Sequence, residues 1–143
     1  MGEQKVKTIQ GAAEGKSEAK TGAKKIKHRV ARGKIFIQST YNNTIITITD
    51  AQGNVIGWGS AGASGFKGSK KSTPYAAQKT MEETLGKLKN LGLQEVEVFV
   101  KGIGSGRDSA VRALQGADFN VTTVKDITPI KHGGVRPKKV RRV

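Results

Sequence analysis

The chain has 143 residues, no cysteine, 35% hydrophobic residues and a formal net charge of +15 at pH 7. This length favours one domain with a modest core, and the lack of cysteine excludes disulfides, thiolate nucleophiles and cysteine-based zinc sites. Such an excess of positive charge opposes compaction unless a polyanion neutralises it, and nucleic acid is the usual polyanion. An acidic membrane is the other candidate, but no stretch approaches about 18 apolar residues, so we predict a nucleic-acid partner and no membrane.

The positive charge is concentrated at the two ends of the chain. Residues 1–34 contain 10 Lys+Arg and 3 acids (+7), and residues 125–143 contain 7 Lys+Arg and 1 acid (+6). Residues 35–124 contain 9 Lys+Arg and 7 acids (+2), so the three segments add up to the total of +15. This pattern predicts a nearly neutral domain between two basic segments.

We therefore divide the chain into four parts. Residues 1–24 have too few apolar side chains to offset the entropy of an ordered chain, which predicts a disordered N-terminal extension. A basic arm follows over residues 25–33, and the α/β domain is expected over residues 34–128. A basic tail occupies residues 129–143, and the two dense Lys/Arg runs favour phosphate contact over a solvated solubility tail.

Three β-branched or aromatic runs open the domain, over residues 34–39, 44–49 and 55–60. Short turns separate them, Tyr41-Asn42-Asn43 after the first run and residues 50–54 after the second. Sequential strands joined by tight turns predict an antiparallel meander.

A loop rich in Gly, Ser and Lys follows over residues 61–72, and Thr73-Pro74 then predicts the start of a helix, with a hydroxyl N-cap and proline at the first helical position. Gly92 is the expected stop of this helix. Apolar residues at spacings of four, four and three mark its buried face: Ala77, Met81, Leu85 and Leu88.

The last elements are a strand over residues 96–100, a short helix at about 107–115 and a strand over 120–128. The resulting order is β-β-β-α-β-α-β. A meander followed by alternating strands and helices predicts one mixed five-stranded sheet flanked by helices.

The glycine-rich loop from Lys101 to Arg107 lies between a predicted strand and a predicted helix. Glycines here would let a phosphate approach the free N–H groups at the helix start. Arg107 stands where the dinucleotide fingerprint needs glycine, and no Gly-Lys-Ser/Thr occurs at P-loop spacing. We therefore predict only a general phosphate contact for this loop. This prediction is compatible with the alternative that the glycines form a tight turn with a positive φ.

Three lysines, Lys67, Lys70 and Lys71, stand among small residues in the earlier loop. Small side chains would let the backbone lie against a sugar-phosphate surface while the lysines contact phosphates. The alternative is an exposed mobile loop without a ligand. We favour RNA contact because this loop also leads into a helix start.

The sequence offers little for catalysis. His28 and His132 both lie in basic segments without an acidic neighbour that could make them a catalytic pair. A ribonuclease-H-like nuclease needs several carboxylates around divalent metal ions, and the first strand has none. We therefore predict a protein that is not an enzyme and that binds no metal or cofactor.

Several motifs together resemble a known family. They include Ser39-Thr40-Tyr41-Asn42-Asn43-Thr44, Gly65-Phe66-Lys67-Gly68, Ser72-Thr73-Pro74-Tyr75 and Lys101-Gly102-Ile103-Gly104-Ser105-Gly106-Arg107. In this order they are similar to the bacterial S-eleven family of small-subunit ribosomal proteins, from about Lys25 to Val143. The extension before Lys25 has no clear counterpart in the family.

The resemblance implies a ribonuclease-H-like α/β fold without catalytic function and a structural place in the small ribosomal subunit. It further implies binding of small-subunit ribosomal RNA on the platform near the messenger exit region. The expected neighbours are the S-eighteen and S-twenty-one proteins, with messenger RNA close by. A ribosome-bound protein of the bacterial cytoplasm is expected, because Glu3, Glu14 and Glu18 distinguish the N-terminus from acid-poor transit peptides.

The expected RNA contacts come from both basic segments and from the loops between them. They are Lys25, Lys27, Arg29, Asn42, Asn43, Lys67, Lys70, Lys71, Gly104, Ser105, Arg107, His132, Arg136, Lys138, Lys139, Arg141 and Arg142. The tail departs from the family at Lys131, Gly133, Val135 and Lys138, where Pro, Asn, Cys and Pro are usual. Loss of two prolines predicts a tail that is more flexible before it binds.

Overall fold

The computed structural model describes residues 30–88, 92–136 and 138–139. In this part of the chain five strands form one sheet, in the order β3-β2-β1-β4-β5. β1, β2 and β3 pair antiparallel, whereas β4 pairs parallel with both β1 and β5. This arrangement confirms the predicted α/β fold with a mixed five-stranded sheet. The strands are β1 (Arg32–Ser39), β2 (Thr44–Asp50), β3 (Val55–Ser60), β4 (Glu95–Lys101) and β5 (Asn120–Asp126).

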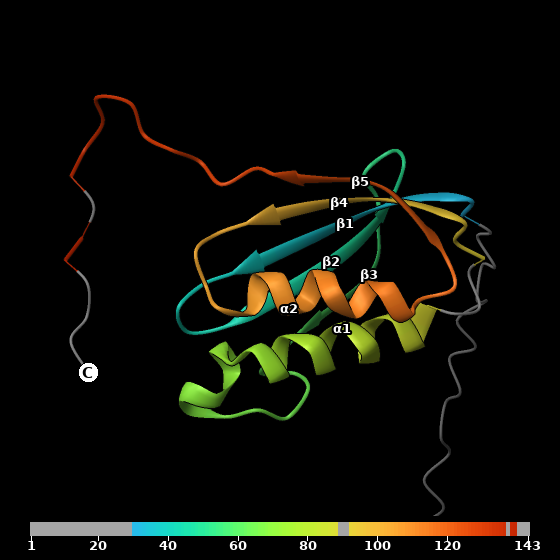
Figure 1. Ribbon diagram of the computed structural model, residues 1–143, viewed down its shortest axis with the longest axis horizontal. Helices are drawn as coiled ribbons and strands as arrows, with labels where there is room; N and C mark the ends of the chain where they lie inside the picture. The colour runs from blue at the N-terminus through green and yellow to red at the C-terminus, as the bar shows by residue number, and fades with distance from the viewer. Residues whose placement is uncertain (1–29, 89–91, 137, 140–143) are drawn as a thin grey trace, which may run out of the picture.

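Two α-helices, α1 (Pro74–Leu88) and α2 (Gly106–Ala113), lie side by side on the same face of the sheet (Figure 1). α1 contacts β2 and β3, and α2 contacts β1 and β4. No described element covers the opposite face of the sheet (Figure 1). The domain therefore has two layers, with one sheet face packed on helices and the other open.

The predicted start of α1 is confirmed. Pro74 is its first residue, and the Thr73 hydroxyl accepts a hydrogen bond from the Ala76 N–H at 3.3 Å. This bond satisfies one of the N–H groups that the first helical turn leaves free. α1 ends at Leu88, and Gly92 has φ +71°, a left-handed conformation that favours glycine.

The core lies between the sheet and the two helices. β-Strands alternate their side chains between the two faces, so every second residue of the central strands points into this space. On the helix side, Ala77, Met81 and Leu88 are buried as predicted, and Leu85 packs at the margin of the core. Fully buried strand residues include Ile35, Ile37, Ile46, Ile48 and Val98.

Some boundaries differ from the prediction. β1 begins at Arg32 because this residue and Gly33 pair with the start of β4. β5 ends at Asp126, whose carboxylate accepts a hydrogen bond from the Thr128 N–H and turns the chain there. The loop over residues 61–72 contains a short 3-10 helix, Gly68–Ser72, and a second one, Leu114–Gly116, extends α2.

The register is irregular in the two outermost strand pairs. Between β2 and β3 it shifts at Ile48/Thr49, and between β4 and β5 it shifts at Val96/Glu97. An extra residue in one strand of a pair bends that strand and increases its twist. The central pairs, β1 with β2 and β1 with β4, run in continuous register.

Candidate nucleic-acid interface

Three chain segments meet where β1, β4 and β5 end, at the left of Figure 1. They are residues 40–43 after β1, residues 102–105 after β4 and residues 127–128 after β5. We call this assembly the loop end of the sheet. It contains several of the predicted RNA contacts but no charged side chain. Its shape must therefore come from hydrogen bonds and close packing.

The loop after β4 is fixed to the last residue of β1 through its backbone. The Gly104 N–H donates to the Ser39 carbonyl at 3.2 Å, and Gly104 itself is buried. A Cβ on Gly104 would lie 2.3 Å from the Ser39 hydroxyl, and one on Gly102 would lie 2.0 Å from the Ser39 carbonyl oxygen. Gly102 also has φ +104°. The positive φ that the sequence suggested is present, and close packing is a second reason for glycine.

Ser105 faces outward and links the loop end to the lysine-bearing loop. Its hydroxyl donates to the Ser72 carbonyl at 2.8 Å. The side chain of Ser105, the N-cap residue of α2, makes no capping hydrogen bond. The N–H groups of Ser105 and Gly106 donate to no residue of the described part of the chain. These groups and the helix dipole favour an anion at this point.

Arg107 has an internal role that the sequence did not predict. Its guanidinium donates to the Gly102 carbonyl at 3.0 Å and pairs with the Asp126 carboxylate. Asp108 lies 3.6 Å from its Nε atom. The arginine therefore connects the glycine loop to the end of β5, and two carboxylates balance its charge. Only 32% of its side chain is exposed.

Asp126 completes this connection, which we call the Arg107–Asp126 brace. Its carboxylate accepts hydrogen bonds from the Thr128 hydroxyl at 2.6 Å and the Thr128 N–H at 2.9 Å. Thr128 in turn accepts a bond from the Gly102 N–H at 3.0 Å. The pKa of Asp126 is lowered from the ordinary 3.8 to about 2. The hydrogen bond from the Thr128 hydroxyl contributes most, followed by the bond from the Thr128 N–H and then the bond from Arg107. The sequence analysis predicts a strand through Thr128 and misses this turn, for which Asp126 followed two residues later by Thr128 is the local signal.

The turn between β1 and β2 is closed by Thr40. Its N–H donates to the Asn43 carbonyl at 2.9 Å, and its hydroxyl accepts from the Asn43 N–H at 3.1 Å. Asn42 is exposed at the tip of the turn. The side-chain oxygen of Asn43 is buried and accepts no hydrogen bond from a described residue. The two asparagines, predicted as equivalent contacts, therefore lie in different surroundings.

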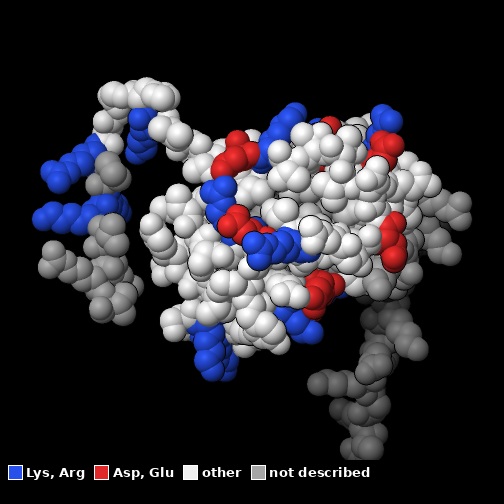
Figure 2. All heavy atoms as spheres, viewed as in Figure 1, with Lys and Arg blue, Asp and Glu red and all other residues white. Residues whose placement is uncertain are grey.

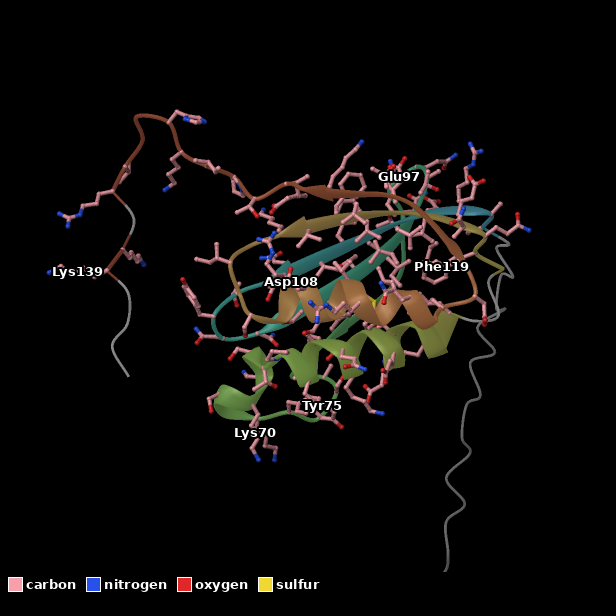
Figure 3. The ribbon with its side chains drawn as sticks, viewed as in Figure 1. Lys70, Tyr75, Glu97, Asp108, Phe119 and Lys139 are labelled. Carbon is pink, nitrogen blue, oxygen red and sulfur yellow. The ribbon has the colours of Figure 1, made fainter. Side chains whose placement is uncertain are left out.

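The three predicted lysines lie at and within the 3-10 helix that precedes α1. Lys67 and Lys70 are exposed, and Lys71 is half-buried. Figure 3 shows Lys70 pointing outward from this segment, on the helix side of the domain. None of the three forms an ion pair within the described residues. Their ammonium groups are therefore not neutralised by carboxylates of the described part of the chain.

The C-terminal tail leaves the loop end and runs away from the domain (Figure 1). Its visible charges are all positive, whereas blue and red side chains are mixed on the domain surface (Figure 2). The described predicted contacts here are His132, Arg136, Lys138 and Lys139, all exposed. The remaining predicted contacts lie outside the described residues: Lys25, Lys27, Arg29, Arg141 and Arg142.

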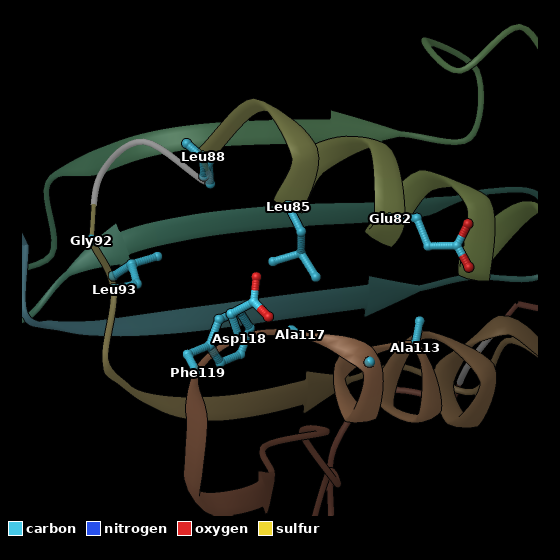
Figure 4. Close-up of a pocket in the computed structure, with 10 residues that line it drawn as sticks. Glu82, Leu85, Leu88, Gly92, Leu93, Ala113, Ala117, Asp118 and Phe119 are labelled. Carbon is cyan, nitrogen blue, oxygen red and sulfur yellow. The ribbon is translucent and has the colours of Figure 1, made fainter.

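A pocket lies away from this surface, between the end of α1 and the segment that joins α2 to β5 (Figure 4). It has a volume of about 350 Å³ and is lined mainly by apolar residues such as Leu85, Leu93 and Phe119. Its charged lining residues are Glu82 and Asp118. Across the described residues, no group of three His, Cys, Asp or Glu side chains could hold a metal ion. No helix in this part of the chain could span a membrane.

Comparisons with known proteins bear on the whole domain. A sequence model of the family described as ribosomal protein S11 matches residues 33–142. Proteins named small ribosomal subunit protein uS11 from Borreliella burgdorferi (strain ZS7) and Borreliella afzelii (strain PKo) are 53% identical to this chain over 120 residues. Each match covers 84% of this chain and 92% of the relative. A protein of the same name from Borrelia garinii subsp. bavariensis matches equally well.

Proposed function

Because the chain belongs to the ribosomal protein S11 family, it is a structural, non-enzymatic component of the small ribosomal subunit, and we propose that it holds ribosomal RNA between its loop end and its tail. Its partners are ribosomal RNA and other ribosomal proteins. In finer detail, we propose a place on the platform near the messenger exit region, beside the S-eighteen and S-twenty-one proteins. The proposed location is the cytoplasm, with messenger RNA nearby.

One observation supports the RNA contacts most directly: four segments that carry predicted contacts meet at the loop end, namely the turn after β1, the lysine-bearing loop, the glycine loop and the tail. The Ser105–Ser72 hydrogen bond joins the loop end to the segment that carries Lys70 and Lys71, and the tail begins directly after Thr128, which accepts a hydrogen bond from the Gly102 N–H. Phosphate contacts fix the position of a protein on RNA, whereas base contacts give specificity. We therefore assign the lysines and the tail to phosphates and Asn42 to an RNA group at the tip of the turn.

The domain and tail have different tasks in this proposal. The tail brings positive charge to RNA and orders when phosphates neutralise it, releasing counterions. The loop end offers a surface whose hydrogen bonds are already formed, so little order must be gained there on binding. Assembly then consists of electrostatic capture by the tail and seating of the loop end against folded RNA.

The test is a salt titration of the full chain with small-subunit ribosomal RNA fragments. Deletion of residues 129–143 removes six Lys+Arg, which should lower the slope of log affinity against log salt by up to about 4–5. A control variant carries Lys79→Gln and Lys87→Gln on the exposed side of α1, and its slope should stay close to that of the unaltered chain. An equal slope for the deletion and the unaltered chain would contradict the role of the tail.

A further inference from the structure

The open face of the sheet carries a row of side chains that crosses all five strands. The pairing register places Trp58, Thr47 and Phe36 side by side on β3, β2 and β1. The row continues with Phe99 on β4 and Lys125 on β5. Neighbouring strands are about 4.8 Å apart, so the row spans roughly 19 Å. Three of its five members are aromatic.

These aromatic side chains are accessible. Trp58 is 61% exposed, although large apolar residues usually lie inside a domain of this size. Phe36 and Phe99 stack with ring centroids 5.1 Å apart and are only half-buried. Glu97, labelled in Figure 3, points to the same open side, away from the helices. The face is therefore an unpartnered aromatic surface in the described part of the chain.

The charges around the row are positive on balance. Arg32 and Glu95 neutralise each other through a 2.8 Å ion pair, and Glu97 is register partner to Lys34. Lys101 and Lys125 have no carboxylate partner among the described residues. This composition argues against a protein partner, because lysine is depleted from the cores of protein–protein interfaces. It favours single-stranded nucleic acid, because an aromatic ring can stack on a base while a nearby lysine contacts the phosphate of the same nucleotide.

We infer that this face binds unpaired bases of RNA, which stack on Trp58 and the Phe36–Phe99 pair while Lys101 and Lys125 contact the adjoining phosphates. Single-stranded RNA is commonly recognised by aromatic side chains on an open sheet face. Lys101 ends β4 immediately before the loop end, so the two surfaces are continuous. The inference deepens the proposed function, because it assigns a second surface of the domain to RNA and specifies its unpaired regions.

Trp58 is the only tryptophan of the chain, so its fluorescence reports contact at this face directly. The full chain should be titrated with a single-stranded oligoadenylate of about eight nucleotides and with an RNA duplex of equal length. Both ligands offer phosphates to the tail, but only the single strand offers free base faces. We expect saturable quenching of Trp58 by the single strand and little quenching by the duplex.

Substitutions separate stacking from apolar contact, with affinity measured by the anisotropy of labelled RNA. Trp58→Phe keeps an aromatic ring and should retain single-strand affinity within about threefold. Trp58→Leu keeps apolar bulk and should lose roughly 5- to 50-fold for the single strand, with duplex affinity unchanged. Tyr75→Leu is the control, because Tyr75 is 67% exposed on the helix side and should not matter.

The outcomes distinguish this inference from the proposed function. If Trp58→Leu binds the single strand as tightly as the unaltered chain does, the stacking role is overturned and the face suits an apolar protein partner. Equal quenching by duplex and single strand would overturn it too, while RNA binding as such would stand. If the full chain binds neither RNA, both the inference and the proposed function fail.

Discussion

The loop end and the C-terminal tail lie next to each other, yet they are built in opposite ways. The loop end has no charged side chain, and its backbone is held by glycine packing, the Thr40 turn and the Arg107–Asp126 brace. The tail has Arg136, Lys138 and Lys139 exposed and extends away from the domain. The loop end thus has a fixed backbone shape but no charged side chains, whereas the tail has exposed positive charges but does not pack against the described part of the domain.

This difference suggests two physical contributions to RNA binding. Contacts by the tail should weaken steeply with salt, because they depend on counterion release. Contacts at the loop end should depend little on salt and strongly on the integrity of the fold. Variants in the two regions should therefore change different measured quantities, the salt slope in one case and the free energy of unfolding in the other.

The largest effect is expected from Gly102→Ala at the loop end. The new Cβ would meet the Ser39 carbonyl oxygen at 2.0 Å in a residue with φ +104°, so we expect a loss of about 2–4 kcal/mol in the free energy of unfolding. Urea denaturation measures this loss. In folded protein the salt slope of RNA binding should stay unchanged.

Gly53→Ala is the matched control for that substitution. Gly53 has a similar φ of +99°, but a Cβ there would have no neighbour within 4 Å. It should cost only about 1 kcal/mol, the strain of the left-handed conformation. Equal losses for the two variants would show that close packing on Ser39 is unimportant and would weaken the contrast between the two regions.

In the tail, the triple change Arg136→Gln, Lys138→Gln and Lys139→Gln should have the reverse effect. Removal of three phosphate contacts should lower the salt slope by about 2–3 and affinity by on the order of 100-fold at 0.1 M salt. The free energy of unfolding should change by less than about 0.5 kcal/mol, because these residues are exposed. A large change in stability would show that the tail packs on the domain.

Asp126→Asn tests the connection between the two regions through its dependence on pH. The carboxyl pKa is about 2 in the folded chain and 3.8 ordinarily, so the folded state favours the ionised form. Its stabilising contribution is complete above pH 3.8 and is lost as pH falls toward 2. The unaltered chain should thus lose stability in this window more steeply than the variant does, as followed by thermal unfolding. If the variant and the unaltered chain lose stability in parallel across this window, the charge of Asp126 does not stabilise the brace.

The smallest effect is expected from Lys70→Gln, next to the loop end. One phosphate contact is worth at most about 0.9 in the salt slope, and an exposed lysine adds little to stability. Lys79→Gln on α1 is the control and should leave the slope unchanged. If both variants behave alike, the lysines beside the loop end act only through the overall charge of the protein.

Much of the fold could be predicted from local patterns. The β-branched runs, the Thr73-Pro74 helix start and the spacing of Ala77, Met81 and Leu88 each follow from interactions between residues close in sequence. These patterns gave the element order and the mixed sheet. The start of β1 could not be predicted in this way, because it depends on pairing with β4, more than sixty residues away.

The site was harder to predict, because its geometry depends on residues distant in sequence. The sequence predicts Arg107 as a phosphate contact, whereas its pairing with Asp126 depends on the positions of the start of α2 and the end of β5. The sequence correctly predicts a positive φ in the glycine loop. It does not predict the close packing of this loop on Ser39, because that packing depends on β1 and β4 being neighbours in the sheet. The aromatic row could not be predicted from the sequence, because it depends on the register of four strand pairs, including the shift at Ile48/Thr49.

The register shifts at Ile48/Thr49 and Val96/Glu97 also affect how prone the chain is to aggregate before it binds RNA. β3 and β5 are the outer strands of the sheet, and an unpaired strand can template the addition of a strand from another molecule, which begins aggregation. Both irregularities lie in the pairs that contain these outer strands, and Lys125 adds charge to β5. Bulges and edge lysines disfavour edge-to-edge pairing, so these features are expected to oppose aggregation of the free chain.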